Sequence, residues 1–182
     1  MRTSYLFALP LLASLSACDT SLKLEEGSDA QGHTAPTAIT LKANQAVIAN
    51  RPFSNQADFE DAKRGLIAQD ESLITLDQNG KSVWDMPAYD FIKYKGANGD
   101  APASVNPSLW RQESLNNMHG LYKVKDGIYQ LRGYDLANMS IIEGDKGWIL
   151  IDPLTAKETA DKALKFAQKH LGTKPITAVI YT

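Results

Sequence analysis

Hydrophobic positions in the first half of the chain predict a helix and then a hairpin. Phe59, Ala62 and Leu66 recur at i, i+3 and i+7 behind Asn55, which predicts a short helix capped by that asparagine. Two apolar runs, residues 73–76 and 82–84, then lie on either side of Asn79-Gly80. Asn-Gly favours the tight turn of a β-hairpin, so these runs are expected to pair.

A second helix is predicted to begin at Pro107, because proline suits the first helical position after a capping residue such as Asn106. Gly120 is the expected end of that helix. Beyond it the spacing is typical of strands, and glycine-containing turns divide the apolar runs into two further hairpins. The predicted strands cover residues 121–125, 128–132, 139–143 and 148–151.

The last part of the chain predicts a βαβ unit and therefore an α/β fold. Thr155 and Glu158 have the spacing of a capping box, and an apolar helical face follows them up to Gly172. Residues 176–181 are almost continuously apolar, which is typical of a strand buried on both faces. Ligand sites in such sheets lie beyond the carboxyl ends of the strands, here at Asp152 and at Thr182.

The N-terminus has the pattern of a lipoprotein signal peptide over residues 1–18. Its apolar run, residues 5–12, is too short to cross a bilayer, which takes about 20 residues. The run ends in Leu-Ser-Ala-Cys, a bacterial lipobox in which Cys18, the single cysteine, is the predicted lipidation site. We expect export and anchoring on the periplasmic face of a membrane; an ordinary signal peptide and a soluble periplasmic protein are the alternative. Residues 19–56, rich in small and polar side chains, are expected to form a flexible tether.

Charge and histidine spacing exclude two classes of function for this chain. The formal net charge is −2 and no run of Lys or Arg is present, so nucleic-acid binding has no electrostatic support. His33, His119 and His170 lack the spacing of metal ligands, and no metal site is expected within the chain. The tryptophans are expected in the core rather than on a ligand-binding surface; they are Trp84, Trp110 and Trp148.

The C-terminal pattern resembles the opening of the metallo-β-lactamase fold, through the hairpins, "GWILIDPLTAKETADKAL" and "ITAVIYT". Longer stretches are similar to the linear alkylsulfatases of that superfamily, which hydrolyse detergents such as dodecyl sulfate. These stretches are "DFEDAKRGLIA", "VWDMPAYDF", "VNPSLWRQESLNNMHGLY" and "GIYQLRGYDLANMSIIEGDKGWILIDPL". On this resemblance residues 57–120 are an N-terminal extension. Residues 121–182 begin an αββα catalytic domain that is incomplete here.

The resemblance also implies a cofactor, a substrate and an assembly. The superfamily motif His-x-His-x-Asp-His, which holds two zinc ions, would follow directly after Thr182. The full-length protein would be a homodimer that acts on alkyl sulfates, whereas this chain alone would bind no zinc and be inactive. Another hydrolase of the same fold, or a non-catalytic lipoprotein that binds amphiphiles, is the alternative.

Two residues of this chain are candidates for the site. By the resemblance, Asp152 supports the metal-ligand loop without binding substrate; capping the following turn is the simpler alternative. Asn138, in a loop between two predicted strands, could donate an amide hydrogen to sulfate or line an alkyl channel. Asparagine is also a common turn former, which is the alternative for Asn138.

The lipobox generates the first prediction. Replacing Cys18→Ser removes the only acceptor for the lipid, so we expect the protein to leave the membrane fraction and appear as soluble or uncleaved precursor. Fractionation and immunoblotting measure this, with Ser16→Ala as a control that keeps the cysteine. Equal membrane retention of wild type and Cys18→Ser would exclude lipidation.

Overall fold

A computed structural model describes residues 34–92 and 101–182. The predicted signal peptide with Cys18, His33 and the first part of the predicted tether lie outside these residues. No helix in the described part of the chain is both long and apolar enough to span a bilayer.

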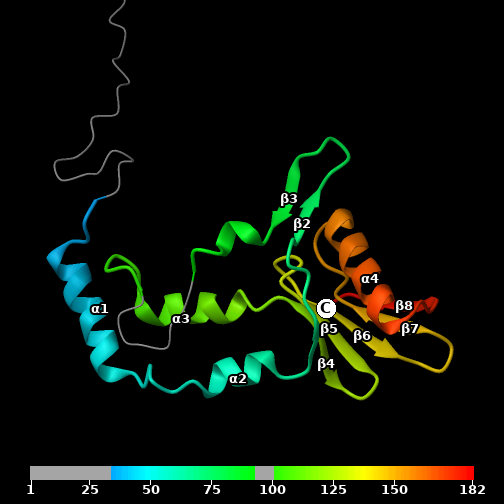
Figure 1. Cartoon of the computed structure of the whole chain (residues 1–182), viewed down its shortest axis with the longest axis horizontal. Coiled ribbons are helices and arrows are strands. Elements are labelled where there is room, and N and C mark those ends of the chain that lie inside the picture. Colours follow the sequence, from blue (N-terminus) through cyan, green and yellow to red (C-terminus); the bar gives the residue numbers. More distant parts are fainter. Residues whose placement is uncertain (1–33, 93–100) are drawn as a thin grey trace, which may run out of the picture. The chain divides into compact units, whose positions relative to one another are not determined.

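Six strands form one mixed sheet in the order β1-β4-β5-β6-β7-β8 (Figure 1). Neighbouring strands are antiparallel except β7 and β8, which are parallel and are connected through helix α4, Lys157–Leu171. The two C-terminal hairpins and the βαβ unit predicted from the sequence are therefore confirmed. The strands are β1 Leu66–Ala68, β4 Gly120–Lys125, β5 Ile128–Arg132, β6 Met139–Glu143, β7 Trp148–Ile151 and β8 Ile176–Ile180.

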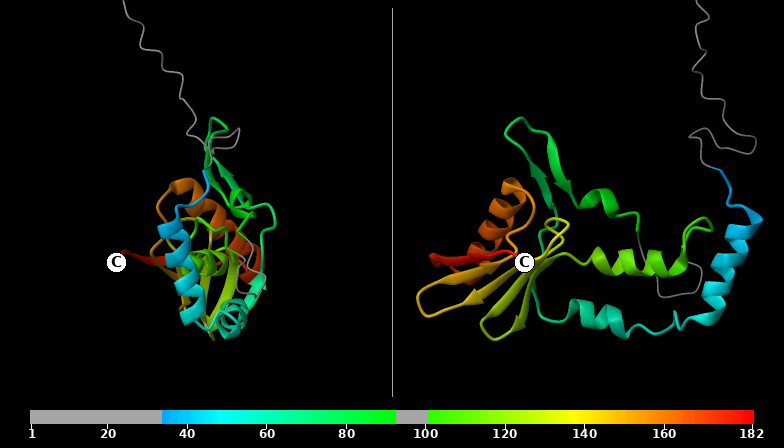
Figure 2. Two further views of the ribbon diagram at one scale, coloured as in Figure 1. Left: turned by 90° about the vertical axis from the view of Figure 1, so that its left-hand side faces the viewer. Right: turned by 180° about the vertical axis from the view of Figure 1, so that it is seen from behind.

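The main core lies between this sheet and helix α4 (Figure 2). Every second residue along a strand points to the same face of the sheet, and large apolar side chains cover the face toward α4. They include Leu121, Leu131, Met139, Ile141, Trp148 and Leu150. Helix α4 contributes Ala163 and Ala167, both fully buried. Alanine at these two positions lets the helix backbone lie close to the large side chains of the sheet.

The capping box predicted at the start of α4 is wrong. The N-cap residue is Ala156, which offers no side-chain oxygen to the helix. Thr155 instead donates both its backbone N–H and its hydroxyl to the carboxylate of Asp135, at 3.1 and 2.5 Å. A buried carboxylate is the stronger acceptor, so it takes the hydroxyl that would otherwise have capped the helix. The predicted end is confirmed: Gly172, with φ 84°, is the C-cap.

Helix α2 spans Ala57–Lys63 and is shorter than the sequence pattern predicts. Asn55 does accept a hydrogen bond from the N–H of Ala57, at 2.9 Å. Leu66, expected on the helix, belongs to β1 because Gly65 turns the chain with φ 77°. A Cβ at Gly65 would lie 2.1 Å from the carbonyl oxygen of Lys123, so only glycine allows this approach of the two backbones.

The other predicted helix and the first hairpin are confirmed. Helix α3 spans Pro107–Asn116, and the side chain of Asn106 accepts hydrogen bonds from the first turn. The helix ends before Gly120, which instead begins β4. Strands β2 (Ile74–Leu76) and β3 (Ser82–Asp85) pair in a separate two-stranded sheet, and a short 3-10 helix, η1 (Pro87–Tyr89), follows.

A helix also occupies part of the predicted tether, which corrects that prediction for residues 38–50. Helix α1, Ala38–Asn50, is capped by the hydroxyl of Thr37. Its residues are mainly good helix formers, and the Asn44 amide donates to the carbonyl of Ala103 at 2.8 Å. The composition indicated a linker, whereas the carbonyl of Ala103, far away in sequence, holds helix α1 through Asn44.

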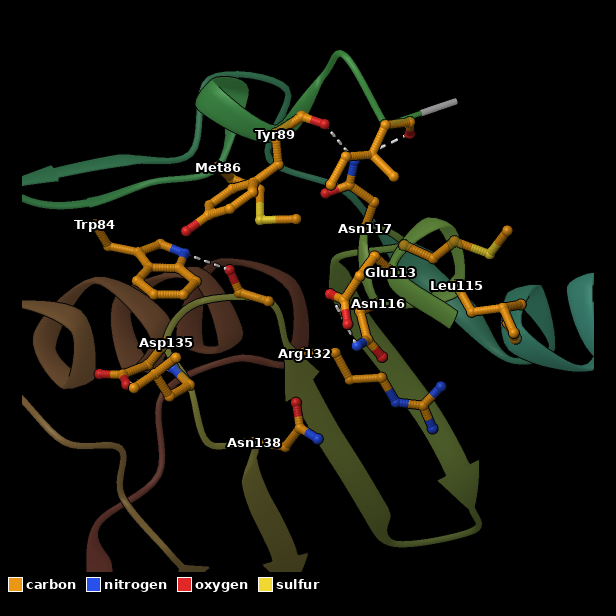
Figure 3. A pocket seen from close by; sticks show the side chains of 15 residues that line it. Trp84, Met86, Tyr89, Glu113, Leu115, Asn116, Asn117, Arg132, Asp135 and Asn138 are labelled. Atoms are coloured by element: carbon orange, nitrogen blue, oxygen red, sulfur yellow. Dashed lines mark hydrogen bonds between the residues drawn. The ribbon is translucent and has the colours of Figure 1, made fainter. Parts of the chain in front are cut away.

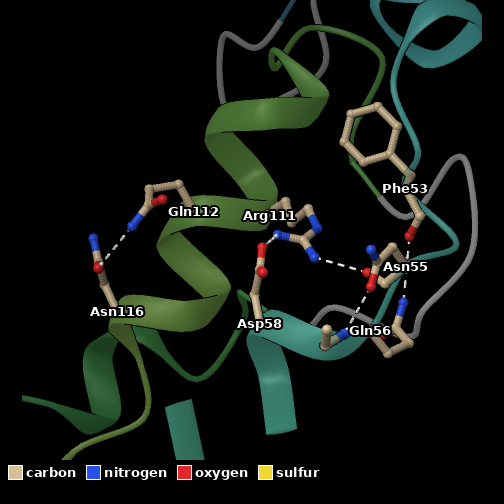
Figure 4. A network of polar contacts seen from close by, with 8 residues as sticks. Phe53, Asn55, Gln56, Asp58, Arg111, Gln112 and Asn116 are labelled. Carbon is tan, nitrogen blue, oxygen red and sulfur yellow. Dashed lines mark hydrogen bonds and ion pairs between the residues drawn. The ribbon is translucent and has the colours of Figure 1, made fainter. Parts of the chain in front are cut away.

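An arginine joins helices α2 and α3 (Figure 4). Arg111 pairs with Asp58 at 2.7 Å and donates to the carbonyl of Asn55 at 2.9 Å. Its guanidinium lies 5.0 Å from the centre of the Phe59 ring. The Arg111 side chain is mostly buried, so the planar guanidinium combines an ion pair, a hydrogen bond and an aromatic contact in one place.

Strand β8 is exposed in this structure, contrary to the burial predicted from its apolar run. It is the last strand in the sheet order, and Val179 and Ile180 are 45% and 46% exposed. The sequence pattern indicated that both faces of this strand are apolar enough to be buried. Among the described residues, however, β8 pairs only with β7, and its other edge is open. Each large aliphatic side chain left in water forfeits roughly 1.5–3 kcal/mol of burial.

The open β8 edge leads to a prediction about solubility. Residues 19–182, expressed without the lipid, should form inclusion bodies or dye-binding oligomers, because an apolar unpaired strand promotes association. Val179→Lys places a charge on that strand and should lower dye binding, while Leu109→Lys, on an exposed helical position, should not. A sharp, cooperative melt of wild-type monomer above ~50 °C would contradict this prediction.

Candidate functional site

The carboxyl ends of β7 and β8 are joined by Asp152. Its backbone N–H donates to the carbonyl of Ile180 at 2.9 Å, and its carboxylate accepts from the N–H and the hydroxyl of Thr182, at 2.8 and 2.7 Å. Asp152 has φ 51° and Leu154 has φ 70°, both in the left-handed region that few non-glycine residues adopt. Strained backbone of this kind is common at functional sites. The structure therefore places Asp152 at the strand ends, where the sequence indicated a site.

The Thr182 donors also change the acidity of Asp152. Hydrogen bonds from the hydroxyl and then from the N–H of Thr182 lower the pKa of the carboxyl below its ordinary value. The side chain is open to solvent, so the carboxylate stays charged at neutral pH while it fixes the direction in which the chain leaves β8.

A cavity of about 470 Å³ lies between the β5–β6 loop, helix α3 and the segment after β3 (Figure 3). Its apolar lining comes mainly from aromatic, leucine and methionine side chains, with amides and charged groups around them. The lining residues are Ala62, Trp84, Met86, Tyr89, Ile92, Glu113, Leu115, Asn116, Asn117, Met118, Arg132, Gly133, Asp135, Leu136 and Asn138.

Asn138 lines this cavity and lies at the same end of the β6–β7 strand pair as Asp152. Ser140 pairs with Ile151 in the antiparallel β6–β7 ladder, so residue 138 and residue 153 come out at the same end of adjacent strands. The Asn138 side chain is exposed and has room for a ligand. The register therefore brings both residues singled out from the sequence to one region.

Arg132 is less available to a ligand than its charge indicates. Its Nε donates to the side-chain oxygen of Gln130 at 2.7 Å, and its guanidinium lies 4.3 Å from the centre of the Tyr122 ring. In Figure 3 the side chain extends away from Trp84. The other polar side chains that line the cavity with Asn138 include the amides of Asn116 and Asn117 and the carboxylates of Glu113 and Asp135.

The loop of residues 133–138 is held by a network that the sequence did not reveal. Asp135 is buried and accepts from Leu136, Thr155 and Thr159, and the indole N–H of Trp84 donates to the carbonyl of Gly133 at 2.7 Å. Burial alone would raise the pKa of Asp135, but the hydrogen bonds from the two threonines and two backbone N–H groups lower it. In the sequence Asp135 is a turn residue 20 positions from Thr155, and no local spacing links the two.

The histidines and tryptophans have mixed roles. In the described part of the chain no three His, Cys, Asp or Glu residues gather as a metal site would require. His119 bonds to the carbonyl of Asp70 at 2.8 Å, and the His170 ring packs 4.6 Å from that of Phe166. Trp148 is fully buried, as predicted, whereas Trp84 is half-buried and forms part of the cavity wall.

Comparison with known proteins shows similarity to a superfamily model and to several sulfatases. Residues 132–182 match the model of the metallo-β-lactamase superfamily. The chain is 46% identical to an (R)-specific secondary-alkylsulfatase of Pseudomonas over 94% of its own length, which is 25% of that relative. An alkyl/aryl-sulfatase of Saccharomyces cerevisiae is 48% identical over 79% of this chain and 22% of its own. The chain thus spans about a quarter of the length of these relatives.

A solved structure shows the same fold. A stereoselective inverting sec-alkylsulfatase from Pseudomonas superposes with a TM-score of 0.72 at 49% identity, covering 81% of this chain and 23% of that one. Its double mutant superposes with a TM-score of 0.74 over the same shares.

The Asp152–Thr182 contact leads to a prediction about pH. Because the folded-state pKa is depressed, the contact is complete above the ordinary aspartate pKa of about 3.9 and is lost as the pH falls through the lower folded-state value. The amide NMR signal of Thr182 should therefore titrate with a midpoint below that of an exposed aspartate. Asp152→Asn should abolish the titration, while Asp145→Asn, in the β6–β7 turn, should leave it unchanged. A midpoint near 3.9 would contradict the assigned contact.

Proposed function

Because this chain is homologous to alkylsulfatases of the metallo-β-lactamase superfamily over most of its length, we propose that the protein it is part of hydrolyses alkyl sulfate esters to alcohol and sulfate. The similarity that carries the proposal is not confined to the superfamily segment, residues 132–182. It includes the extension, residues 57–120, which a generic fold match does not cover. Other hydrolases of the superfamily are therefore the weaker candidates.

The cavity supports this proposal by its chemistry. An alkyl sulfate has a long apolar tail and a compact anionic head, so its site needs apolar walls and a few placed hydrogen-bond donors. Trp84, Met86 and Leu115 offer the apolar contact. Asn138 lines the cavity near the carboxyl end of β7, and we propose that it gives its amide hydrogen to a sulfate oxygen or lines the path of the alkyl chain.

The metal centre of such an enzyme does not fit the residues described here. We propose that its ligands lie in sequence following Thr182, in a catalytic domain with the αββα architecture of the superfamily, and that the ions are a pair of zinc ions. Bound zinc supplies hydroxide at neutral pH and neutralises negative charge. Asp152 would act on that loop from a distance, since its two hydrogen bonds to Thr182 set the direction of the chain beyond β8.

The cellular setting is also part of the proposal. The lipobox supports lipidation at Cys18 and a place on the periplasmic face of a membrane. An enzyme anchored there would meet amphiphilic sulfates where they partition into the bilayer. We propose in addition that the full-length protein is a homodimer, as the resemblance to the alkylsulfatases implies.

Activity of the full-length protein tests the proposal. It should release sulfate and dodecanol from dodecyl sulfate, lose this activity in a chelator, and regain it with zinc. Sulfate is measured by ion chromatography and the alcohol by gas chromatography, with dodecyl sulfonate, whose C–S bond resists hydrolysis, as the control substrate. A zinc-loaded protein that ignores alkyl sulfates but opens β-lactams would overturn it.

A further inference from the structure

We propose that Asp135 is a positioning residue for substrate binding: its carboxylate fixes the loop of residues 133–138, one wall of the cavity, to helix α4. This inference rests on the proposed function for the identity of the substrate. It goes beyond that function because Asp135, although part of the cavity wall, has both carboxylate oxygens occupied by donors of the protein and acts through the residues on either side of it.

The carboxylate of Asp135 is fully used. Oδ1 accepts the backbone N–H of Leu136 and the hydroxyl of Thr155, both at 2.5 Å. Oδ2 accepts the backbone N–H of Thr155 at 3.1 Å and the hydroxyl of Thr159 at 2.6 Å. Each oxygen therefore receives one N–H and one O–H, and the three donor residues come from the loop itself, the turn after β7 and helix α4. Hydrogen bonds to a buried charge are among the stronger ones in proteins.

Helix α4 is the fixed side of this connection. Thr159 is 1% exposed and lies on the helical face that also buries Ala163 and Ala167 in the core. The loop has one apolar anchor before Asp135: Tyr134 is fully buried, and its ring lies 5.7 Å from that of Phe166 in α4. After Asp135 none of residues 136–138 is buried, so that part of the loop depends on the carboxylate. Leu136 is 86% exposed, and Asn138 is exposed as well.

A second hydrogen bond, from the Trp84 indole to the carbonyl of Gly133, holds the start of the loop. The buried polar atoms thus fix the loop backbone while its exposed side chains line the cavity. Loosening Asp135 should therefore disturb the cavity wall and leave the helix in place.

The arrangement of donors makes Asp135→Asn a sharp test. Either orientation of an asparagine amide would place its NH₂ group against a backbone N–H, of Leu136 or of Thr155, and neither of these can reverse its role. One backbone link is therefore lost whichever way the side chain turns. Thr159→Val removes, at nearly constant shape, the hydroxyl that lies 2.6 Å from Asp135 Oδ2 and 2.9 Å from the Ala156 carbonyl. Thr159→Ser keeps this hydroxyl, which gives a matched pair.

The experiment uses the full-length, zinc-loaded protein and dodecyl sulfate. We expect Asp135→Asn to raise KM about tenfold with kcat within about twofold, Thr159→Val to raise KM severalfold, and Thr159→Ser to retain the wild-type KM. A purely structural role would lower the melting temperature and the active fraction at unchanged KM, and that result would overturn the inference. So would equal KM values for Thr159→Val and Thr159→Ser. If Asp135→Asn fails to fold, the Thr159 pair decides.

Binding separates this inference from the proposed function. Isothermal titration with dodecyl sulfonate reports occupation of the cavity without hydrolysis. A wild type that binds the sulfonate yet hydrolyses no alkyl sulfate would refute the activity, whereas weaker binding by Thr159→Val than by Thr159→Ser would still support the role of Asp135. Equal sulfonate affinity of the two Thr159 variants would refute that role even in an active enzyme.

Discussion

The close packing of helix α4 on the sheet is the constraint on which the rest of the structure depends. Ala163 and Ala167 bring the helix against Trp148 and its neighbours, and the same packing buries Thr159 at the start of the helix. The buried hydroxyl lies within hydrogen-bond distance of the Ala156 carbonyl and, at a shorter 2.6 Å, of Asp135 in the β5–β6 loop. The apolar packing thus puts a polar group in reach of the loop, and the contact with Asp135 helps to determine where one wall of the cavity lies.

The second consequence of this packing appears at the end of β7. The segment between the end of β7 and the start of α4 turns within a few residues. Asp152 and Leu154 adopt positive φ values in this turn. Such conformations cost of order 1–3 kcal/mol each and persist only where the surroundings enforce them. Here the Asp152 N–H is paired with β8 and its carboxylate with Thr182, so the strained turn also directs the chain beyond the last strand.

Local sequence patterns predicted the helices and strands, whereas contacts between residues far apart in sequence determine the geometry around the cavity. Asn79-Gly80 and the alternation within β4 to β7 were sufficient for the hairpins because strand pairing across a short turn is a local matter. The capping box failed because Asp135, far away in sequence, takes the Thr155 hydroxyl. Helix α1 was missed for a similar reason, since the acceptor for Asn44 is the distant Ala103. The place of Asp152 at the end of β7 could be predicted because strand ends can be located from local sequence, whereas a buried aspartate in a turn has no local signature.

The cavity is built from two parts of the chain that differ in what they match among known proteins. One wall, with Gly133, Asp135 and Asn138, lies within residues 132–182, the segment that matches the superfamily model. The opposite wall, with Trp84, Met86 and the end of α3, comes from the extension that precedes it. The reaction that a protein catalyses depends on the residues of its site rather than on its fold. In this chain the segment that precedes residues 132–182 therefore supplies most of the apolar wall of the cavity. The Trp84–Gly133 hydrogen bond ties these two parts together at the wall where both meet a ligand.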